Sequence, residues 1–394
     1  MSKTVEGYLL IADITGYTWY LSESELEHAQ DTLTELLELL VDQTRPPLVI
    51  SRLAGDAVIS YGLQDNFLLG QTFIEIIENT YVAFRKAIEL MVMNNSCQCN
   101  ACANVSRLDL KFFLHFGSFG IQRISDHDEL VGSEVNLLHR LLKNNVTEKT
   151  GFAAYVLYTE AAIEHLEAKD LLESMTPHHE SYEHLGQVKV WVQDLHPVWE
   201  SRQQEMAIEI PEDEVDAEFS IDIDVPPEKL WDYMMLPEFR NGLIGSDRMV
   251  IANRSQGRIA PGSVYQCYHG EKLVPQTIIA WQPFERIVVR QPFPMAQSNT
   301  MLAEYRLEPR KGGTRLALRS SELSGPVPGR LLFKLMRPII SKMVMGQMDA
   351  FKQRLEDDYR QLREGVGSDA EIANSAIREA AAAGLQASTS PASP

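Results

Sequence analysis

The sequence predicts an α+β protein with two domains and an acidic linker between them. The chain has 394 residues, more than the roughly 150–200 residues of one typical domain. Its first half alternates strand-like and helix-like segments, whereas its second half has a series of short strands and then one long helical segment. We assign residues 1–197 to the first domain, 198–216 to the linker, 217–364 to the second domain and 365–394 to a disordered tail.

The first domain contains three segments with helical periodicity and two with strand periodicity. Apolar residues recur at helical spacing in residues 18–42, 73–93 and 134–144. Residues 108–117 alternate between apolar and polar side chains, as a half-buried strand does, and residues 188–192 predict a closing strand. The alternation indicates helices that pack against a sheet.

The second domain is preceded by a polar, acidic stretch between Pro197 and Asp216, which predicts a linker. Six strands are expected at residues 219–225, 263–270, 273–281, 286–291, 301–309 and 314–321. A long helix follows, with apolar residues at helical spacing from Leu331 to Leu355. After about Glu364 the chain is rich in Ala, Ser and Gly, which predicts disorder.

The composition excludes several classes of partner. A formal net charge of −19 argues against nucleic acid and against anionic membrane surfaces, which need clustered Lys and Arg. Four unevenly spaced cysteines do not suggest a disulfide framework and favour a reducing compartment. No secretory signal and no apolar run of the ~20 residues needed for a membrane span are present. We therefore expect a soluble cytoplasmic protein without a transmembrane segment.

Two aspartates stand at glycine-containing turns beside apolar runs. Asp13 follows Leu9-Leu10-Ile11-Ala12, and Asp56 lies in Leu53-Ala54-Gly55-Asp56-Ala57-Val58. Two carboxylates on neighbouring strands would form an oxygen-ligand site for Mg²⁺ or Mn²⁺. The alternative is that both are turn carboxylates that cap nearby backbone N–H groups.

The expected helix at residues 134–144 carries a second pair of polar residues. Asn136 and Arg140 are four residues apart and therefore lie on one face. Together they can hydrogen-bond a sugar oxygen and stabilise charge that develops on a phosphate. Taken alone, such a pair is more often part of a solvated helix face.

In this order, the motifs resemble the class III nucleotidyl cyclase domain over residues 7–192. The matching motifs are Ala12-Asp13-Ile14-Thr15-Gly16, Gly55-Asp56-Ala57-Val58, His115-Phe116-Gly117 and Val131-Gly132-Ser133-Glu134-Val135-Asn136-Leu137-Leu138-His139-Arg140. The resemblance implies a ferredoxin-like α/β sandwich that works as a homodimer.

The resemblance also implies a role for each motif. Asp13 and Asp56, with the carbonyl of Ile14, would bind two Mg²⁺ or Mn²⁺ ions that bridge the triphosphate of ATP or GTP. Asn136 and Arg140 would be catalytic, orienting the ribose and stabilising the transition state from the opposite protomer.

The chain departs from the family pattern at three positions. Where adenylate cyclases have a Lys and an Asp that recognise the base, this chain has Arg52 and Glu129. That charge pattern is nearer to the adenine type, so cAMP is a more expected product than cGMP, although Arg is not a simple substitute for Lys. Leu185 replaces an expected triphosphate-binding Lys, with Lys189 close by. A catalytically degenerate module that binds nucleotide therefore remains an alternative.

A cysteine cluster lies between the second helix and the strand at residue 108. Cys97, Cys99 and Cys102 could ligate Zn²⁺, with His115, His139 or a partner chain's cysteine as the fourth ligand. Free thiols or a redox pair remain alternatives. The stretch His139-Arg140-Leu141-Leu142-Lys143-Asn144 and this cluster also resemble a bacterial family of unknown function that is related to the cyclases.

Residues 217–362 resemble the START-like helix-grip superfamily (SRPBCC, polyketide cyclase/dehydrase-like). The resemblance rests on Ile223-Asp224-Val225-Pro226-Pro227-Glu228-Lys229-Leu230-Trp231-Asp232, Trp281-Gln282-Pro283 and Gly312-Gly313-Thr314. It implies a curved antiparallel sheet around the long C-terminal helix, with a cavity for a hydrophobic small molecule or lipid between them. Candidate polar groups in that cavity are His269, Tyr265 and Arg290. The alternative is that the helix face is ordinary core without a ligand.

The sequence therefore predicts a nucleotidyl cyclase-like signalling protein that is coupled to a domain for a hydrophobic ligand. The alternatives are a nucleotide-binding regulatory module without turnover, and a protein whose main function lies in the second domain.

Overall fold

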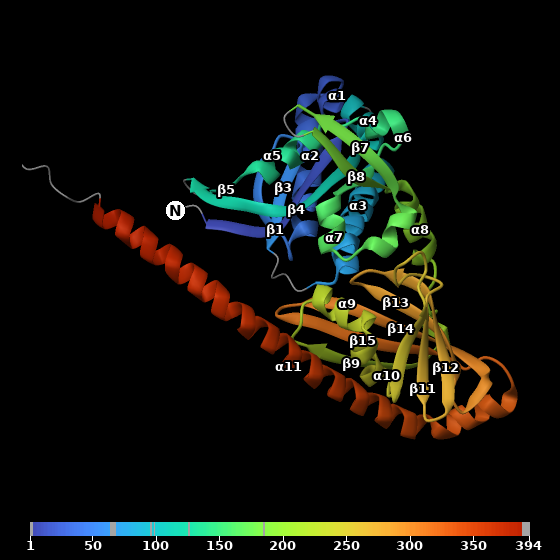
Figure 1. The fold of residues 1–394 in the computed structure, drawn as a ribbon. Helices are drawn as coiled ribbons and strands as arrows, with labels where there is room; N and C mark the ends of the chain where they lie inside the picture. The colour runs from blue at the N-terminus through green and yellow to red at the C-terminus, as the bar shows by residue number, and fades with distance from the viewer. Residues whose placement is uncertain are drawn as a thin grey trace, which may run out of the picture.

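Two β-sheets, one in each half of the chain, organise the structure (Figure 1). This computed structural model describes residues 3–63, 68–94, 97, 99–124, 127–183 and 186–387. Helices pack against both sheets, so the predicted mixed α+β class is confirmed. Among the described residues, no helix combines the length and the apolarity that a membrane crossing requires.

The first sheet has eight strands in the order β2-β3-β1-β4-β6-β8-β7, with β5 paired to β4. Its central strand β1 is antiparallel to both β3 and β4. The strands are β1 (Lys3–Thr15), β2 (Val49–Ala54), β3 (Ala57–Leu63), β4 (Asp109–Ile124), β5 (His127–Val131), β6 (Tyr155–Thr159), β7 (Thr176–Tyr182) and β8 (Gly186–Asp194).

Helices cover both faces of the first sheet. Because side chains alternate along a strand, Leu10 and Ala12 of β1 pack toward α2 (Leu26–Thr44) and α3 (Gly70–Met93). Leu9 and Ile11 pack in the opposite core, with α5 (Ser133–Leu141) and α6 (Val146–Thr150). The remaining short helices are α1 (Tyr17–Ser22), α4 (Asn100–Asn104), α7 (Glu160–His165) and the 3₁₀ turns Val105–Arg107 and Lys169–Ser174. The single helix expected at residues 18–42 is thus two helices, α1 and α2.

The second sheet is an antiparallel meander in which the first strand closes beside the last. Its seven strands have the order β10-β11-β12-β13-β14-β15-β9. They are β9 (Val215–Ile223), β10 (Arg248–Asn253), β11 (Val264–His269), β12 (Lys272–Gln282), β13 (Arg286–Phe293), β14 (Ala296–Arg310) and β15 (Gly313–Ser321). Two short helices, α9 (Pro227–Met235) and α10 (Pro237–Ile244), connect β9 to β10, and both begin with a proline at a position that suits it.

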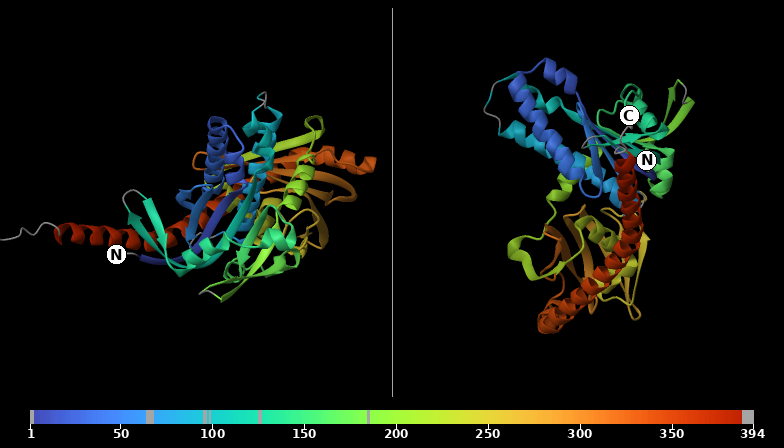
Figure 2. Two further views of the ribbon diagram at one scale, coloured as in Figure 1. Left: turned by 90° about the horizontal axis from the view of Figure 1, so that it is seen from above. Right: turned by 90° about the vertical axis from the view of Figure 1, so that its left-hand side faces the viewer.

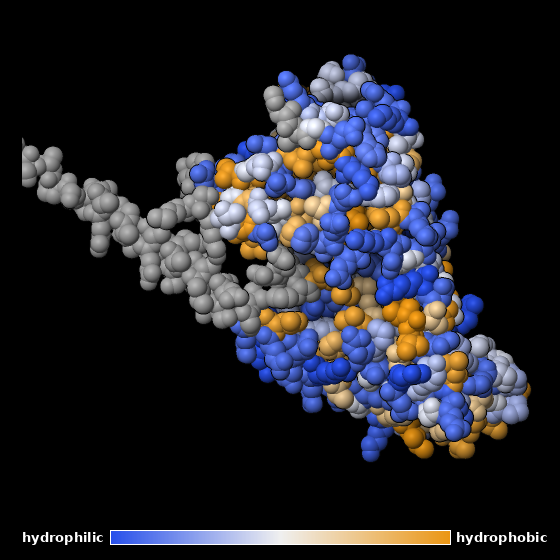
Figure 3. Space-filling view, in the orientation of Figure 1, coloured by the Kyte–Doolittle hydropathy of each residue, from blue (hydrophilic) through white to orange (hydrophobic). Residues whose placement is uncertain are grey.

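A helix of 61 residues, α11 (Val327–Ala387), completes the second domain. Met348, Phe351 and Leu355 are buried in the domain core. The N-terminal part of the helix differs: Phe333 is buried, but Leu331 and Leu335 are 68% and 78% exposed. Apolar residues accordingly gather at the lower edge of the molecule, where the N-terminal part of α11 lies (Figure 3). The alternative that the apolar helix face is ordinary core therefore does not describe this part.

The C-terminal end of α11 lies where the sequence predicts a disordered tail. The helix continues through residues 365–387, and Figure 2 shows it running past the second sheet. Residues 380–383 are all alanine, which has the highest intrinsic helix propensity of any residue type. Composition alone therefore does not distinguish disorder from a helix in this segment.

The acidic stretch expected to be a linker contains a packed helix, α8 (His196–Met206). Its Trp199, Arg202 and Glu205 are buried, although the stretch as a whole is polar. The reason is that its charged residues have partners in both domains. Arg202 lies 3.9 Å from Glu78 of α3, and Glu205 accepts a hydrogen bond of 2.8 Å from the backbone N–H of Trp281 in β12.

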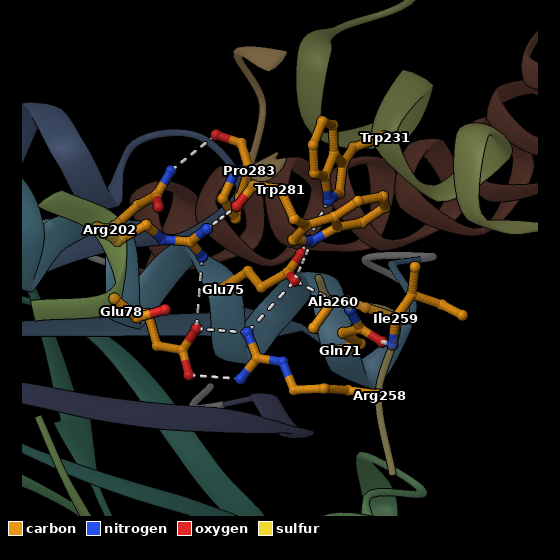
Figure 4. A network of polar contacts seen from close by, with 12 residues as sticks. Gln71, Glu75, Glu78, Arg202, Trp231, Arg258, Ile259, Ala260, Trp281 and Pro283 are labelled. Atoms are coloured by element: carbon orange, nitrogen blue, oxygen red, sulfur yellow. Dashed lines mark hydrogen bonds and ion pairs between the residues drawn. The ribbon is translucent and has the colours of Figure 1, made fainter. Parts of the chain in front are cut away.

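Two glutamates of α3 are completely buried between the domains (Figure 4). Glu78 accepts two hydrogen bonds of 2.6 Å from the guanidinium of Arg258, which belongs to the second domain. Burial opposes the ionisation of Glu78, but Arg258 and Arg202 outweigh it and hold its pKa below the ordinary value. Glu78 is therefore a buried carboxylate that is ionised and paired.

The other buried glutamate, Glu75, is held mainly by neutral donors. The indole N–H groups of Trp231 and Trp281 donate to its two oxygens at 2.8 and 2.7 Å. Burial raises the pKa of Glu75, and the more distant Arg258 opposes that shift. The two tryptophans thus join the core of the second domain to the polar face of α3.

The start of α3 makes further bonds to the second domain. The side chain of Gln71 exchanges two hydrogen bonds with the backbone of Ile259, at 2.7 and 2.9 Å. The carboxylate of Asp232 accepts hydrogen bonds from the hydroxyl of Thr72 and the N–H of Leu69, where a negative charge is favoured at a helix N-terminus. The apolar face of α3 therefore packs in one domain while its polar face bonds the other.

We predict that Glu78→Gln destabilises the protein by about 3–5 kcal/mol, because it leaves Arg258 buried without its principal counter-charge. Chemical denaturation of the full chain measures this free energy of unfolding. Glu35→Gln is the matched control, since Glu35 is exposed on α2 and its replacement should change stability by less than about 0.5 kcal/mol. Equal stabilities of Glu78→Gln and the control would contradict the prediction.

Candidate functional site

The two aspartates singled out in the sequence lie together at the end of β1. Asp13 is opposite Ala57 of β3, and Asp56 precedes Ala57 in the turn between β2 and β3. The N–H of Ile14 donates a hydrogen bond of 3.1 Å to the carbonyl oxygen of Asp56. Gly55, with φ of +67°, permits this tight turn. The pairing of β1 with β3 therefore brings the carboxylates side by side.

The surroundings of Asp13 make its ionisation unfavourable. Burial raises the pKa of Asp13 to about 6, the charge of Asp56 adds to this shift, and Lys111 opposes it. Lys111 lies directly across from Asp13 on β4, and burial lowers its own pKa. Its ammonium is 5.1 Å from the ring centroid of Tyr155. The sequence analysis missed Lys111, although a charged residue next to Phe112 and Phe113 in an apolar strand was an available signal.

The donor set fits a hard divalent cation. Two carboxylates repel each other in a half-buried position, and Mg²⁺ or Mn²⁺ prefers such oxygen ligands together with the oxygens of a phosphate. Asp13 and Asp56 could hold such an ion. The side chain of Ile14 is buried in the core with α2 and α3, so any contribution of this residue would come from its backbone carbonyl.

Arg52 and Glu129 form an ion pair with a distance of 3.1 Å between their charged atoms. Arg52 comes from β2, which pairs with β3, and Glu129 comes from β5, which pairs with residues 120–124 of β4. Both side chains are accessible, at 42% and 29% exposure. Burial lowers the pKa of His139 on α5, and the nearby Arg52 lowers it further. The structure therefore places the two predicted base-recognition residues together, close to α5.

The predicted catalytic residues Asn136 and Arg140 lie on the solvent-exposed face of α5. The opposite face of this helix, with Val135 and Leu138, packs on the sheet. Among the residues that the structure describes, neither Asn136 nor Arg140 has a side-chain hydrogen bond or ion pair to Asp13 or Asp56. Within one copy of the chain, these two side chains therefore make no described polar contact with the two carboxylates.

His115 and Gly117 determine how α5 sits on β4. The two ring nitrogens of His115 contact the hydroxyl of Thr159 at 2.8 Å and the carboxylate of Glu134 at 2.7 Å. At Gly117, a Cβ atom would lie 2.7 Å from the side chain of Glu134. The His-x-Gly motif therefore allows the close approach of α5, and His115 is not available as a zinc ligand.

The cysteine cluster has a different histidine beside it. The metal-ligating atoms of His28, Cys97, Cys99 and Cys102 all lie within 4.8 Å of one another. The fourth member is a histidine, as one of our alternatives had it, but neither of the two candidates, His115 and His139, belongs to this group. His28 lies on the exposed side of α2, where nothing in the sequence pattern marks it. The backbone N–H of Cys102 is the main reason why the pKa of Cys99 is lowered, to about 7.

The position expected to carry a triphosphate-binding lysine, Leu185, lies outside the described residues. Lys189, the nearby alternative, forms an ion pair of 2.7 Å with Glu160. It also lies 5.3 Å from the ring centroid of Trp191.

A cavity of about 700 Å³ lies in the second domain, between the sheet and α11. Its wall is mainly apolar, and includes Val274, Phe293, Tyr305, Met336, Ile339, Ile340 and Met343. Of the three predicted polar groups, His269 lines the cavity. Tyr265 instead donates a hydrogen bond to the carbonyl of Met235, and Arg290 is exposed and is not among the lining residues.

Gln276 of β12 is a polar residue in this wall that the sequence analysis missed. Its side chain is fully buried and lines the cavity. The amide nitrogen donates to Gln291, but the oxygen has no hydrogen-bond partner among the described residues. A buried acceptor without a donor costs about 1–3 kcal/mol. A ligand that donates a hydrogen bond would satisfy it.

Several known proteins are similar to parts of the chain. A family described as a protein of unknown function, DUF2652, matches residues 33–150. An uncharacterized protein of Mycobacterium tuberculosis is 25% identical over 166 residues, which are 41% of this chain and 73% of that protein. The structure of the guanylyl cyclase Cya2 matches with a TM-score of 0.39 and 15% identity, over 48% of this chain and 92% of that chain. The adenylyl cyclase CyaB from P. aeruginosa matches with a TM-score of 0.35 and 14% identity, over 49% and 96%. These structural matches are confined to about half of the chain.

We predict that Gly117→Ala displaces α5 from β4 and destabilises the first domain by about 1–3 kcal/mol, because the added methyl group overlaps Glu134. Hydrogen exchange of the amides of α5, together with chemical denaturation, measures the effect. Gly242→Ala in α10 is the matched control, because a Cβ there meets no atom within 4 Å. Unchanged protection of α5 in Gly117→Ala would show that this close approach is not needed.

Proposed function

We propose that the first domain is a nucleotidyl cyclase-like domain that binds ATP, or less readily GTP, with Mg²⁺ or Mn²⁺ and converts it to a cyclic nucleotide. The observation that carries the proposal is the placement of Asp13 beside Asp56 by the pairing of β1 with β3. The accessible ion pair of Arg52 and Glu129 supports it, since a linked cation and carboxylate can donate to and accept from a nucleotide base.

The proposed cyclisation reaction assigns a role to each charged residue of the site. Asp13 and Asp56 would hold the divalent ions, which when bound neutralise the triphosphate and make the ribose 3′-hydroxyl easier to deprotonate. The 3′ oxygen then forms a bond to the α-phosphorus, the bond from that phosphorus to the bridging oxygen breaks, and pyrophosphate leaves. Arg140 would stabilise the charge on the phosphate in the transition state, and Asn136 would orient the ribose.

A homodimer explains why Asn136 and Arg140 are exposed and separate from the carboxylates. In a head-to-tail pair, α5 of one copy would face Asp13 and Asp56 of the other, and two-fold symmetry would create two such sites. The exposed position of both side chains on α5 supports this arrangement.

The test is the formation of cyclic AMP or cyclic GMP from ATP or GTP with Mn²⁺, measured by mass spectrometry. We expect Asp56→Ala and Arg140→Ala each to abolish activity, and their mixture to recover about a quarter of it, because half of the dimers then contain one intact site. The exposed Asp42→Ala on α2 is the matched control and should remain active.

Three outcomes separate the alternatives. Activity without recovery on mixing would contradict the composite site. Manganese-dependent nucleotide binding that Asp13→Ala abolishes, without any product, would establish the degenerate nucleotide-binding module instead. If no product forms and neither Asp13→Ala nor Asp56→Ala alters nucleotide binding, both the cyclase activity and the metal-dependent nucleotide-binding module are contradicted.

A second function is supported by Gln276 in the cavity of the second domain. We propose that this domain binds a hydrophobic small molecule or lipid whose apolar part fills the cavity between the sheet and α11. Its polar end would carry a hydroxyl or amide donor that bonds the unpaired oxygen of Gln276. A cavity with an apolar wall and one convergent polar group is typical of such sites.

We predict that a long-chain alcohol displaces a fluorescent apolar probe from the full chain about tenfold better than its methyl ether, which lacks the donor. Gln276→Leu should remove this preference and keep the affinity for the ether. Gln266→Leu, on the neighbouring strand β11 and outside the cavity wall, is the control and should keep the preference. Equal displacement by alcohol and ether in the unaltered chain would contradict the role of Gln276.

A further inference from the structure

We propose that His28, Cys97, Cys99 and Cys102 form a structural zinc site that fastens the start of α2 to Cys97 and the first turn of α4. This site is separate from Asp13 and Asp56 and does not rest on the function proposed for them. Its four residues come from two parts of the chain that are far apart in sequence, and the fold brings them together at one end of the first domain.

The distances between the four ligand atoms are close to those around a tetrahedrally coordinated metal ion. Nδ1 of His28 lies 3.2 Å from Sγ of Cys99 and 3.7 Å from Sγ of Cys97, and all four ligand atoms are within 4.8 Å of one another. With zinc–sulfur distances of about 2.3 Å and a zinc–nitrogen distance of about 2.0 Å, tetrahedral ligands lie about 3.5–3.8 Å apart. A zinc ion therefore fits between these atoms with small adjustments of side chains.

The donor set selects zinc and a structural role. Three thiolates and one imidazole occupy all four positions of a tetrahedron, which is typical of closed structural sites rather than catalytic ones. Soft thiolate ligands disfavour Mg²⁺ and Mn²⁺, which prefer oxygen. The cluster therefore selects zinc over the ions that oxygen ligands prefer, whether or not a metal binds at Asp13 and Asp56.

Hydrogen bonds from backbone and side-chain groups position the cluster. The N–H of Cys102 donates to Sγ of Cys99 at 3.4 Å, which stabilises negative charge on that sulfur. The carboxylate of Glu25, just before α2, accepts from the N–H of Ala101 at 3.1 Å and from the amide of Asn100 at 3.3 Å. These bonds position the two parts of the chain in the way that hydrogen bonds around metal ligands do.

The location gives the ion a consequence for the rest of the domain. Cys99 caps the N-terminus of α4, and Ala101 and Val105 are buried in the main core of the first domain. The guanidinium of Arg107 lies 4.4 Å from the ring centroid of Trp19 in α1. Because α1 joins β1 to α2, fixing α2 to this segment restrains the stretch of chain that follows Asp13.

A redox pair of Cys99 and Cys102 is the competing explanation. A disulfide between them would leave Cys97 and His28 without a role at the same point. The convergence of four ligand atoms of zinc-binding type, rather than two thiols alone, favours the metal.

The test is the zinc content of the full chain, purified without chelator from zinc-supplemented cells. We expect about one zinc per chain, released when the thiols are modified by a mercurial, with the metal detected by a chromogenic chelator. Cys99→Ser and Cys102→Ser should lose the metal, and His28→Gln should retain it at least about tenfold less tightly. Cys267→Ala and His179→Gln, outside the cluster, are matched controls that should keep it.

Substitution by Co²⁺ provides a second measurement if a cysteine variant does not fold. Tetrahedral thiolate-bound cobalt has intense visible bands and a sulfur-to-metal charge-transfer band, and His28→Gln should shift both. A chelator should also lower the melting temperature of the unaltered chain, since loss of a ligand that binds the native state destabilises it. Less than about 0.2 zinc per chain, zinc retained after Cys99→Ser, or a Cys99–Cys102 disulfide in protein purified under reducing conditions would overturn the proposal.

Discussion

The buried ion pair between Glu78 of α3 and Arg258 determines how the two halves of the chain fit together. α3 belongs to the core of the first domain through its apolar face, and its polar face is covered by the second domain through Glu75, Glu78 and Gln71. Separating the domains would leave two carboxylates and a guanidinium without their partners, and each such loss is costly in a dry interior. The relative position of the domains is therefore fixed by polar contacts of high geometric specificity rather than by apolar area alone.

This interface also connects the two candidate sites. β12 carries Gln276 in the wall of the cavity and Trp281 at the interface, where its indole bonds Glu75. On the other side, α3 packs in the same core as Leu10, Ala12 and Ile14 of β1. This strand carries Asp13 near its C-terminal end, just before the turn to α1. One strand and one helix thus span the distance from the cavity to the aspartate pair. The domains proposed to bind a hydrophobic ligand and a nucleotide are in this way parts of one packed unit.

The sequence predicted the local features better than the contacts between distant segments. Asp13 and Asp56 were found because a carboxylate beside a glycine turn can be recognised in consecutive residues. Arg52 and Glu129 were found through a family resemblance, which did not predict their ion pair. The interface was missed because residues 198–216 are acidic, as a linker is, and Trp281 and Arg286, which bond α8, lie far along the chain. His28 lies on an exposed helix face, where burial imposes no pattern. Helical periodicity predicted the helix α11, but it indicates an apolar face without showing what covers it, so the exposure of Leu331 and Leu335 was not predicted.

A double-mutant cycle between Glu78→Gln and Arg258→Gln tests the central claim most directly, namely that this buried pair holds the domains together. The free energies of unfolding of the full chain, the two single variants and the double variant are measured by chemical denaturation. We predict an interaction energy of at least about 1 kcal/mol, because residues in one buried ion-pair network do not act independently. Additivity within about 0.3–0.5 kcal/mol would contradict the claim, since it would mean that the two side chains stabilise the protein without depending on each other.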